Sequence, residues 1–289
     1  MKKILLIGGS GQLGTALQED AGMFDADIVS FPRAELDVTN EEQIRQKIKA
    51  TNCDVLLNAA AYHVVTDCEK NFEQAMRVNF ASVVTMARLC KERNIPFITY
   101  STCYVFDGKK KMSYEEQDSP HPLQMYGISK LAGEYGAAAA YPDGSIIIRT
   151  GALYGGGRTG SPEKKGNFVL DILKQAETEQ KIEVTSEQII NPTFAGDLSK
   201  ATLKLLDADA SGGIYHLVNE GYCSYYEFAR EIIARAGKTA VVVGVDRGGR
   251  SGEMRRPRFA ALANIKAASM GIVLPSWQEG LKSYFASLN

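Results

Sequence analysis

The chain has 289 residues, a formal net charge of −1 and an isoelectric point near 6.4, and 45% of its residues are hydrophobic. This balance argues against a protein that binds nucleic acid through charge, and no apolar run approaches the length of a membrane helix. The five cysteines are scattered without a Cys-x-x-Cys pair, which favours reduced thiols in a cytoplasmic protein over a disulfide framework or a metal site.

Strands and helices are expected to alternate through the first 150 residues. The apolar segment KKILLIG is typical of a buried parallel strand, and ADIVSF, CDVLLNAAA, PFITYST and GSIIIRT predict four more. Helices are expected over QLGTALQED, over NEEQIRQKIKA with Asn40 as its cap, and over residues 69–94 and 125–140. This alternation predicts an α/β fold, a Rossmann-type doubly wound parallel sheet in residues 1–150.

The alternation loosens after residue 150, which predicts a smaller α/β lobe in residues 151–289. Helices are expected over 167–178, 195–207, 224–236 and 277–287, and short strands over 181–185, 214–218 and 240–245. The lobe is expected over the carboxyl ends of the strands, where open α/β sheets bind ligands, with the chain free to cross between lobes. The Gly-rich segment 155–166 predicts an exposed loop, and whether it is an ordered lid or disordered stays open.

Three regularly spaced glycines follow the first strand. The segment GGSGQLG places Gly8, Gly11 and Gly14 between that strand and a helix, a context that predicts a dinucleotide-binding turn. Glycine permits the tight turn, lets the backbone approach a pyrophosphate and allows close helix–strand packing, while the helix N-terminus offers free N–H donors. Gly-x-x-Gly-x-x-Gly is the spacing seen in extended short-chain dehydrogenases/reductases. The alternative is a strand–helix turn that binds no ligand.

The end of the second strand bears on which dinucleotide binds. In SFPRAELDVTN no carboxylate stands at the strand end to hold a ribose 2′-hydroxyl, and Arg33 follows closely. An arginine there can pair with the 2′-phosphate of NADP, so NADPH is the expected cofactor. NADH stays open, because a solvated loop arginine explains Arg33 equally well. Asp37 and Val38 are expected beside the adenine.

A tyrosine and a lysine lie four residues apart in YGISK, and on a helix this spacing puts Tyr126 and Lys130 on one face. Ser101 and Thr102 end the fourth strand just upstream. Hydride reduction of a ketone leaves an alkoxide that must be protonated, and a phenol with a pKa of about 10 is roughly three units too basic for this. The lysine ammonium and the nicotinamide charge are expected to lower that pKa, and the Thr102 hydroxyl to hold the carbonyl oxygen. The sequence therefore predicts Thr102, Tyr126 and Lys130 as catalytic residues.

Two further stretches fit this site. NAAA ends the third strand with the small residues Ala59, Ala60 and Ala61, which would let a dinucleotide pass closely. Asn79 in RVN is predicted to hydrogen-bond a backbone carbonyl near the lysine, with a helix-surface amide as the alternative.

Taken together, the motifs resemble the dTDP-4-dehydrorhamnose reductase branch of the extended short-chain dehydrogenases along nearly the whole chain. They are, in order, GGSGQLG, LDVTN, NAAAY, YVFDG, YGISKLAGE, GNFV, NPTFAGDLSKA and RRPRFAALANIKAASMGIVLPSWQEGL, and the last two are specific to the branch. The resemblance implies reduction of the 4-keto group of a nucleotide-linked 6-deoxysugar by NADPH or NADH.

The resemblance also assigns roles by position. Thr102, Tyr126 and Lys130 would form the catalytic triad. The implied cofactor contacts are Gly8, Gly11, Gln12, Leu13, Gly14, Asp37, Val38, Ala59, Ala60 and Ala61. The implied contacts with the sugar nucleotide are Cys103, Tyr104, Asn167, Gln188 and Arg256. A guanidinium can clamp a diphosphate bidentately, which suits Arg256, although a surface arginine is the alternative.

The chain departs from the family pattern where the sugar should lie. The family has Ser-Thr-Asp-Tyr where this chain has Cys103 as the third residue, and His63 and Thr66 stand where the family has a threonine and an aspartate. Ala152 stands where the family usually has a tryptophan. The cofactor half matches, while several substrate-side positions differ, so the sugar is expected either to differ from 4-keto-rhamnose or to be gripped differently. Cys103 is expected to line the pocket rather than act as a nucleophile.

Three functions stay open from the sequence. The first is reduction of dTDP-4-dehydro-L-rhamnose to dTDP-L-rhamnose. The second is 4-ketoreduction of a different deoxysugar nucleotide. The third is a non-catalytic, NADP-binding regulatory subunit similar to that of methionine adenosyltransferase. A dehydratase is disfavoured because Cys103-Tyr104 replaces the Asp-Glu pair that follows the strand-end threonine in that group. No metal site is expected, and a homodimer stays open.

Overall fold

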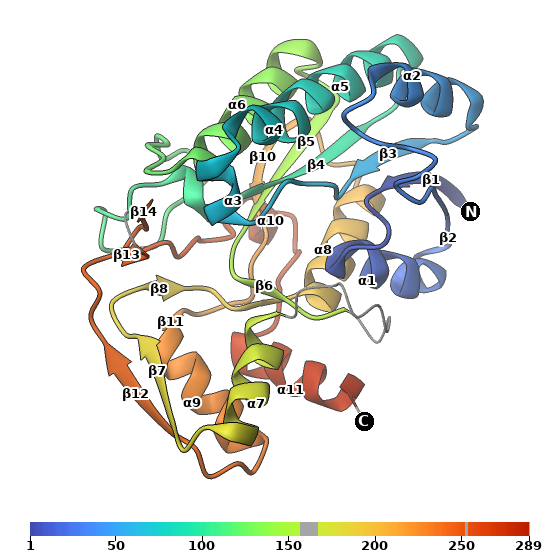
Figure 1. The fold of residues 1–289 in the computed structure, drawn as a ribbon. Coiled ribbons are helices and arrows are strands. Elements are labelled where there is room, and N and C mark those ends of the chain that lie inside the picture. Colours follow the sequence, from blue (N-terminus) through green and yellow to red (C-terminus); the bar gives the residue numbers. More distant parts are fainter. Residues whose placement is uncertain (157–166, 252–253, 289) are drawn as a thin grey trace.

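The computed structural model describes residues 1–156, 167–251 and 254–288 (Figure 1). The strands are β1 Lys2–Ile7, β2 Ala26–Ser30, β3 Val55–Asn58, β4 Phe97–Thr102, β5 Ser145–Thr150, β6 Leu153–Tyr154, β7 Lys181–Thr185, β8 Ile189–Ile190, β9 Thr193–Phe194, β10 Gly213–His216, β11 Cys223–Ser224, β12 Val241–Val245, β13 Arg250–Ser251 and β14 Met254–Arg255. The α-helices are α1 Gln12–Asp20, α2 Glu41–Ala50, α3 Val65–Lys70, α4 Phe72–Met76, α5 Ser82–Arg93, α6 Met125–Ala140, α7 Phe168–Thr178, α8 Ala195–Asp207, α9 Tyr225–Arg235, α10 Ile265–Ser269 and α11 Trp277–Leu288.

A six-stranded parallel sheet with the order β10-β5-β4-β3-β1-β2 forms the larger part of the molecule (Figure 1). The predicted α/β fold with a Rossmann-type parallel sheet is confirmed. Five strands come from the first 150 residues in the predicted places, and β10 returns from the second half of the chain to pair with β5. The division at residue 150 into two lobes stays a prediction, because the chain re-enters the sheet after it.

Both faces of the sheet are buried, which explains the continuous apolar strands. Successive residues point to opposite faces. Ile4 and Leu6 of β1 therefore pack against α1 and α8, whereas Leu5 and Ile7 pack against α2 and α5. Burying both faces fixes the register of β1, and with it the position of the loop that follows.

The helix predicted over residues 69–94 is not continuous. Asn71 interrupts it and caps α4 by accepting a hydrogen bond from the Gln74 backbone N–H, and residues Arg77–Ala81 form a π-helical turn between α4 and α5. The hydrophobic period does not reveal these breaks, because both segments still bury the same face. A π turn within a helix often marks a functional site, and this one carries Asn79.

A smaller group of elements lies below the sheet in Figure 1 and contains α7, α9, α11 and the parallel pair β7–β12. Its apolar core is centred on the buried rings of Tyr154, Phe228 and Tyr284. The sequence predicts its helices and longer strands to within one or two residues, but not the two-residue strands β6, β8, β9 and β11, whose backbone partners lie far along the chain.

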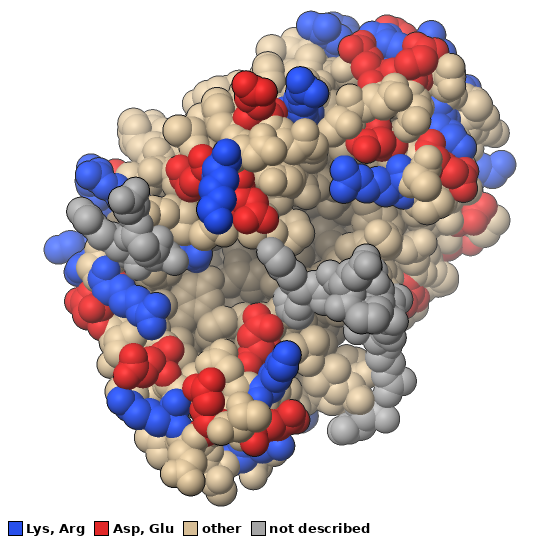
Figure 2. Space-filling view, viewed as in Figure 1, with Lys and Arg blue, Asp and Glu red and all other residues tan. Residues whose placement is uncertain are grey.

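The surface shown in Figure 2 carries interspersed acidic and basic side chains and is hollowed between the sheet and the smaller group of elements. Among the described residues, no helix combines the length and apolar character that a membrane span requires. Most of the loop predicted over 155–166 lies outside the described residues.

Candidate active site

The glycine loop between β1 and α1 is built so that a side chain would clash at two of its three glycines. Gly8 has a φ of +84°, and a Cβ there would lie 2.6 Å from the Ala60 backbone nitrogen. A Cβ on Gly14 would lie 2.3 Å from the Gly8 carbonyl oxygen, so this glycine permits close packing of helix on strand. A Cβ on Gly11 would meet only the Gly8 carbonyl oxygen, at 3.4 Å. The backbone at Gly11 is therefore open to an approaching ligand.

Helix α1 begins at Gln12 with Gly11 as its cap, and no side chain caps its free N–H groups. No acidic residue stands in its first turn, so the partial positive charge of the helix end is not neutralised locally. Leu13 is buried against the sheet. Within the described part of the chain, the buried Gln12 Oε1 atom has no hydrogen-bond partner, and a Cβ on Gly156 would lie 2.5 Å from the Gln12 backbone oxygen.

The predicted adenine-side residues lie together beyond β2. The exposed Arg33 side chain forms an ion pair with Asp37, with 3.5 Å between Nε and Oδ2. Hydrogen bonds from the Thr39 backbone and hydroxyl, and the Arg33 charge, lower the pKa of Asp37. Val38 packs on the core behind the loop. The exposed Arg33 side chain can therefore reorient toward a phosphate, because doing so breaks only a weak surface ion pair.

The alanine segment after β3 adjoins the glycine loop. The Ala59 backbone N–H donates to the Ile7 carbonyl, and the Ala60 N–H donates to Asn58 Oδ1 at 3.1 Å. Ala61 is partly exposed. Gly8 packs directly against the backbone of Ala59 and Ala60, so the glycine loop and the alanine segment lie together at the carboxyl ends of β1 and β3.

Asn79 is buried and hydrogen-bonds a backbone carbonyl, as the sequence predicts. Its amide exchanges two hydrogen bonds with the Tyr62 backbone, at 2.9 and 3.0 Å, and also donates to the Ser129 hydroxyl at 3.0 Å. The helix-surface alternative is therefore wrong. The π turn and Gly133, where a Cβ would lie 2.2 Å from the Asn79 carbonyl oxygen, let α6 approach this residue.

Thr102 and Tyr126 come together at the carboxyl end of β4. The Thr102 hydroxyl accepts a hydrogen bond from the Tyr104 N–H at 3.2 Å and is a hydrogen-bond partner of the Tyr126 hydroxyl. Thr102 is buried and Tyr126 is half-buried. Two hydroxyls that meet at a strand end beside a glycine loop can hold and protonate one carbonyl oxygen.

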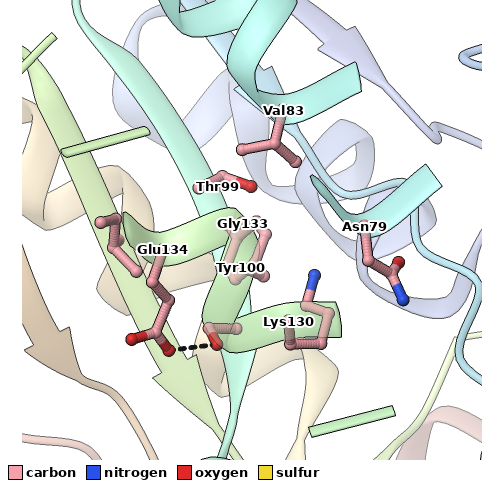
Figure 3. A pocket seen from close by; sticks show the side chains of 9 residues that line it. Asn79, Val83, Thr99, Tyr100, Lys130, Gly133 and Glu134 are labelled. Atoms are coloured by element: carbon pink, nitrogen blue, oxygen red, sulfur yellow. Dashed lines mark hydrogen bonds between the residues drawn. The ribbon is translucent and has the colours of Figure 1, made fainter. Parts of the chain in front are cut away.

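Lys130 lies one turn beyond Tyr126 on α6, but its amino group points into a small hollow between α6 and the sheet (Figure 3). Burial lowers the pKa of Lys130 to about 8. Burial raises the pKa of Tyr126, and the hydrogen bond with Thr102 opposes this. The sequence predicts a lowered pKa for Tyr126. The protein groups around Tyr126 do not lower it below its ordinary value, because the effect of burial is larger than that of the hydrogen bond with Thr102.

Tyr104 links the end of β4 to the C-terminal part of the chain. Its hydroxyl accepts a hydrogen bond from Arg256 Nη1 at 2.9 Å and is also hydrogen-bonded with the Tyr225 hydroxyl. Its ring meets the Tyr126 ring edge-on, with 6.3 Å between centroids. Arg256 Nε is buried without a partner in the described structure. The guanidinium therefore lies one aromatic ring away from the predicted proton donor.

The positions that depart from the family pattern differ in their surroundings. Cys103 is 3% exposed, and burial raises the pKa of its thiol to about 12, with Thr102 as a hydrogen-bond partner. A neutral, buried thiol agrees with the predicted lining role. Ala152 has a φ of +40°, in the left-handed region. His63, just before α3, and Thr66, within α3, are both exposed.

Two predicted substrate residues are committed to the protein itself. Asn167 caps α7 by accepting from the Leu170 N–H at 3.2 Å, and its amide donates to the Tyr284 hydroxyl at 3.0 Å. Gln188 is 5% exposed, just before β8. A direct contact of either with substrate stays a prediction.

A buried ionic network lies behind the site, and none of the sequence motifs indicates it. Glu134 accepts hydrogen bonds from Arg149 Nη2 at 2.7 Å and Nε at 3.0 Å, and Ser101 donates to the same carboxylate. Two signals were available. Glu134 lies one helical turn beyond Lys130, and Arg149 is a charged residue within a strand that is otherwise apolar. A charge in a buried strand needs a buried partner.

The residues present fit a dinucleotide. Gly8 and Gly14 lie against backbone atoms, whereas Gly11 leaves open space. The N-terminus of α1 has no side-chain cap and no acidic residue in its first turn. These features suit the pyrophosphate of a nicotinamide dinucleotide.

The family described as "RmlD substrate binding domain" matches residues 1–289. This chain belongs to the dTDP-4-dehydrorhamnose reductase family. It is 33% identical to the spore coat polysaccharide biosynthesis protein SpsK of Bacillus subtilis, over 98% of this chain and 97% of that protein. It is 31% identical to a dTDP-4-dehydrorhamnose reductase of Mycolicibacterium smegmatis, over 99% of this chain and 86% of that protein.

Among solved structures of the family, the dTDP-4-dehydrorhamnose reductase of Bacillus anthracis in complex with NADP superposes with a TM-score of 0.92. Its sequence is 30% identical, and the match covers 99% of each chain. The family assignment from sequence motifs is confirmed, and it makes this chain a member of an oxidoreductase family.

Proposed function

We propose that this protein reduces the 4-keto group of a nucleotide-linked 4-keto-6-deoxysugar with NADPH, and that its substrate is dTDP-4-dehydro-L-rhamnose. The observation that carries the proposal is the meeting of Thr102 and Tyr126 at the end of β4 in a chain whose glycine loop fits a dinucleotide. The names of the relatives from M. smegmatis and B. anthracis support the substrate and the cofactor. The relative from B. subtilis supports a role in making polysaccharide precursors.

NADPH, when bound, would supply the hydride that reaches C4 of the sugar. Gly8, Gly11 and Gly14 with the N-terminus of α1 would hold its pyrophosphate, and Arg33 is the candidate for its 2′-phosphate. NADH would leave Arg33 paired with Asp37, so the preference for NADPH is part of the proposal.

Tyr126 would donate its hydroxyl proton to the C4 oxygen as the negative charge develops there. Thr102 would hold that oxygen through its own hydroxyl, which already lies beside the phenol. Lys130 would stabilise the resulting phenolate by its positive charge. These groups supply one proton and one oriented hydrogen bond, which matches what carbonyl reduction requires.

Arg256 is the candidate for the diphosphate of the sugar nucleotide. Its Nε atom is buried and has no hydrogen-bond partner among the described residues, while Nη1 donates to the Tyr104 hydroxyl. A diphosphate bound there would lie near the Tyr104–Tyr126 ring pair, which would help to fix the distance between the nucleotide and the reacting carbonyl.

A different keto-sugar nucleotide is the second candidate. The family has an aspartate where this chain has Cys103, and a carboxylate accepts hydrogen bonds from sugar hydroxyls far better than a thiol does. The neutral, buried Cys103 thiol beside Thr102 therefore favours a sugar with different hydroxyl groups near this position. The third candidate, a non-catalytic NADP-binding subunit, is disfavoured because the Thr102–Tyr126 pair is assembled.

The first test is turnover of purified protein with NADPH and a panel of keto-sugar nucleotides, followed at the nicotinamide absorbance band. We expect oxidation of NADPH with dTDP-4-dehydro-L-rhamnose. Oxidation only with another keto-sugar would move the proposal to the second candidate. NADPH binding without turnover of any of them would contradict reductase function.

The second test concerns the proton donor. Tyr126→Phe is expected to lower turnover by about 10²- to 10⁴-fold while NADPH affinity changes little, because only the acid is lost. Tyr135→Phe is the matched control, since Tyr135 lies on the same helix but is 60% exposed. Full activity of Tyr126→Phe would remove the proposed triad.

We also propose a cytoplasmic location, which the five buried cysteines without disulfides support. A homodimer stays a prediction.

A further inference from the structure

A hollow behind α6 brings five polar side chains together beneath the candidate active site. Asn79 from the π turn, Thr99 and Ser101 from β4, and Lys130 and Glu134 from α6 line it (Figure 3). The Lys130 amino group points into the space between Asn79 and Gly133, whereas the Glu134 carboxylate points away toward Ser101. Lys130 has no hydrogen bond or ion pair with any other described residue, so its charge is stabilised only at a distance.

Glu134 cannot move freely toward Lys130. Arg149 holds both oxygens of the carboxylate, at 3.0 and 2.7 Å, and Ser101 donates to one of them. Glu134 is 3% exposed, Arg149 1% and Lys130 5%. With water excluded, the interaction between these charges is much stronger than on the surface. The Glu134 carboxylate is thus held in place one helical turn from the buried Lys130 ammonium, and Arg149 neutralises only part of the negative charge that Lys130 experiences.

We propose that Glu134, held by Arg149, is a positioning residue that keeps the Lys130 ammonium protonated at the pH where the enzyme works. This rests on the proposed function, because a protonated Lys130 matters only if it stabilises a phenolate at Tyr126. Glu134 does not touch the reacting atoms. It acts through Lys130 alone.

Glu134 is the charged group that raises the pKa of Lys130 against the effect of burial. Tyr126 on the same helix and Cys68 from α3 also lie near Lys130, while Asp67 and Glu69 are the acidic residues of α3. The Cys68 thiol and the Tyr126 phenol are neutral at moderate pH because burial raises their pKa values. Burial drives the pKa of Lys130 down to about 8, and the negative charge of Glu134 opposes this fall.

The sign of the effect on the reaction follows. Lys130 must be charged, and its charged fraction falls as the pH rises through its pKa. Without the Glu134 charge that pKa falls further, so activity should be lost at a lower pH.

The test uses a variant that removes both buried charges together, because Glu134→Gln alone would leave Arg149 buried and unpaired. For Glu134→Gln/Arg149→Met we expect the alkaline limb of the kcat profile to move down by about one pH unit. A structural role would lower kcat in this variant without moving the limb. An unmoved limb in the double variant would overturn the proposal.

A second readout needs no turnover and separates this proposal from the proposed function. The free energy of unfolding is measured against pH with and without Lys130→Met, once in the native background and once in Glu134→Gln/Arg149→Met. The pH at which the two curves begin to converge reports the pKa of Lys130 in the folded protein, whereas they merge near the pKa of the unfolded chain. We expect the point where convergence begins to move down by about one unit in the double variant. An unchanged point would refute the role of Glu134, even if the enzyme proved to act on another sugar.

Discussion

Lys130 is a residue at which stability and the proposed chemistry conflict. Its side chain is 5% exposed, and burial displaces its pKa from an ordinary 10.5 to about 8. A displacement of this size corresponds to about 3 kcal/mol of lost stability while the group is charged. Fixed charges kept in a dry site despite their cost to folding are typical of functional groups.

Lys130→Met is therefore expected to stabilise the fold while abolishing turnover. The unfolded chain binds the lysine proton more tightly than the folded chain does, so the cost of Lys130 is full below pH 8 and fades as the pH rises toward 10.5. We expect a gain of about 3 kcal/mol near neutral pH, measured by urea unfolding, and a smaller gain at high pH. A loss of stability at neutral pH would contradict this.

At the scale of single elements, the glycines of the loop between β1 and α1 have different roles: Gly14 is needed for packing, and Gly11 is expected to be needed for binding. Gly14 lets α1 approach β1, and a Cβ there would lie 2.6 Å from the Gly9 Cα, with no flexible side chain able to yield. At Gly11 the nearest atom to a Cβ is a backbone oxygen at 3.4 Å, an ordinary contact. The same residue type therefore serves different purposes three residues apart.

Gly14→Ala is expected to cost stability, on the order of 1–3 kcal/mol, because the helix must shift away from the strand. Gly11→Ala should unfold at nearly the same urea concentration as the native protein but bind NADPH at least about tenfold more weakly, since the new methyl group stands where the pyrophosphate would approach. Urea unfolding and NADPH titration of both variants measure this. Equal NADPH affinity in Gly11→Ala would show that the cofactor does not use this turn.

At the scale of the whole molecule, the second half of the chain completes the first. Strand β10 places His216 directly beside Arg149 of β5, and the His216 ring is fully buried with Nδ1 3.1 Å from the carbonyl oxygens of Tyr114 and Ala263. Burial, together with the Arg149 charge, lowers the pKa of His216 to about 3. The histidine that joins three distant segments thus stays neutral.

This histidine should make the fold sensitive to acid. The unfolded chain takes up a proton near pH 6.5 that the folded chain refuses, so stability is full above pH 6.5 and falls as the pH drops toward 3. At about two pH units below the ordinary histidine pKa, His216 is expected to lower the free energy of unfolding by about 2–3 kcal/mol. His216→Gln should lose less stability between these conditions in urea unfolding, whereas His121→Gln, at an exposed histidine, should follow the native protein. Equal acid losses in both variants would contradict this.

The sequence by itself determined what depends on neighbours along the chain. Apolar strands closed by glycine or polar residues, and caps such as Asn40, which accepts a hydrogen bond from the Gln43 N–H, fixed the elements of the parallel sheet. The strand-end position of Thr102 and the one-turn spacing of Tyr126 and Lys130 follow from the same local geometry. These regularities also carried the family resemblance.

Only the tertiary structure decided which distant groups meet. Arg256 and Tyr104 are 152 residues apart, and neither spacing nor periodicity indicates their hydrogen bond. The partnership of Glu134 with Arg149, the entry of β10 into the sheet and the direction of the Lys130 amino group are of the same kind. They are decided by which buried charges and strand edges must find a partner once water is excluded, and that is a property of the packed chain rather than of any segment.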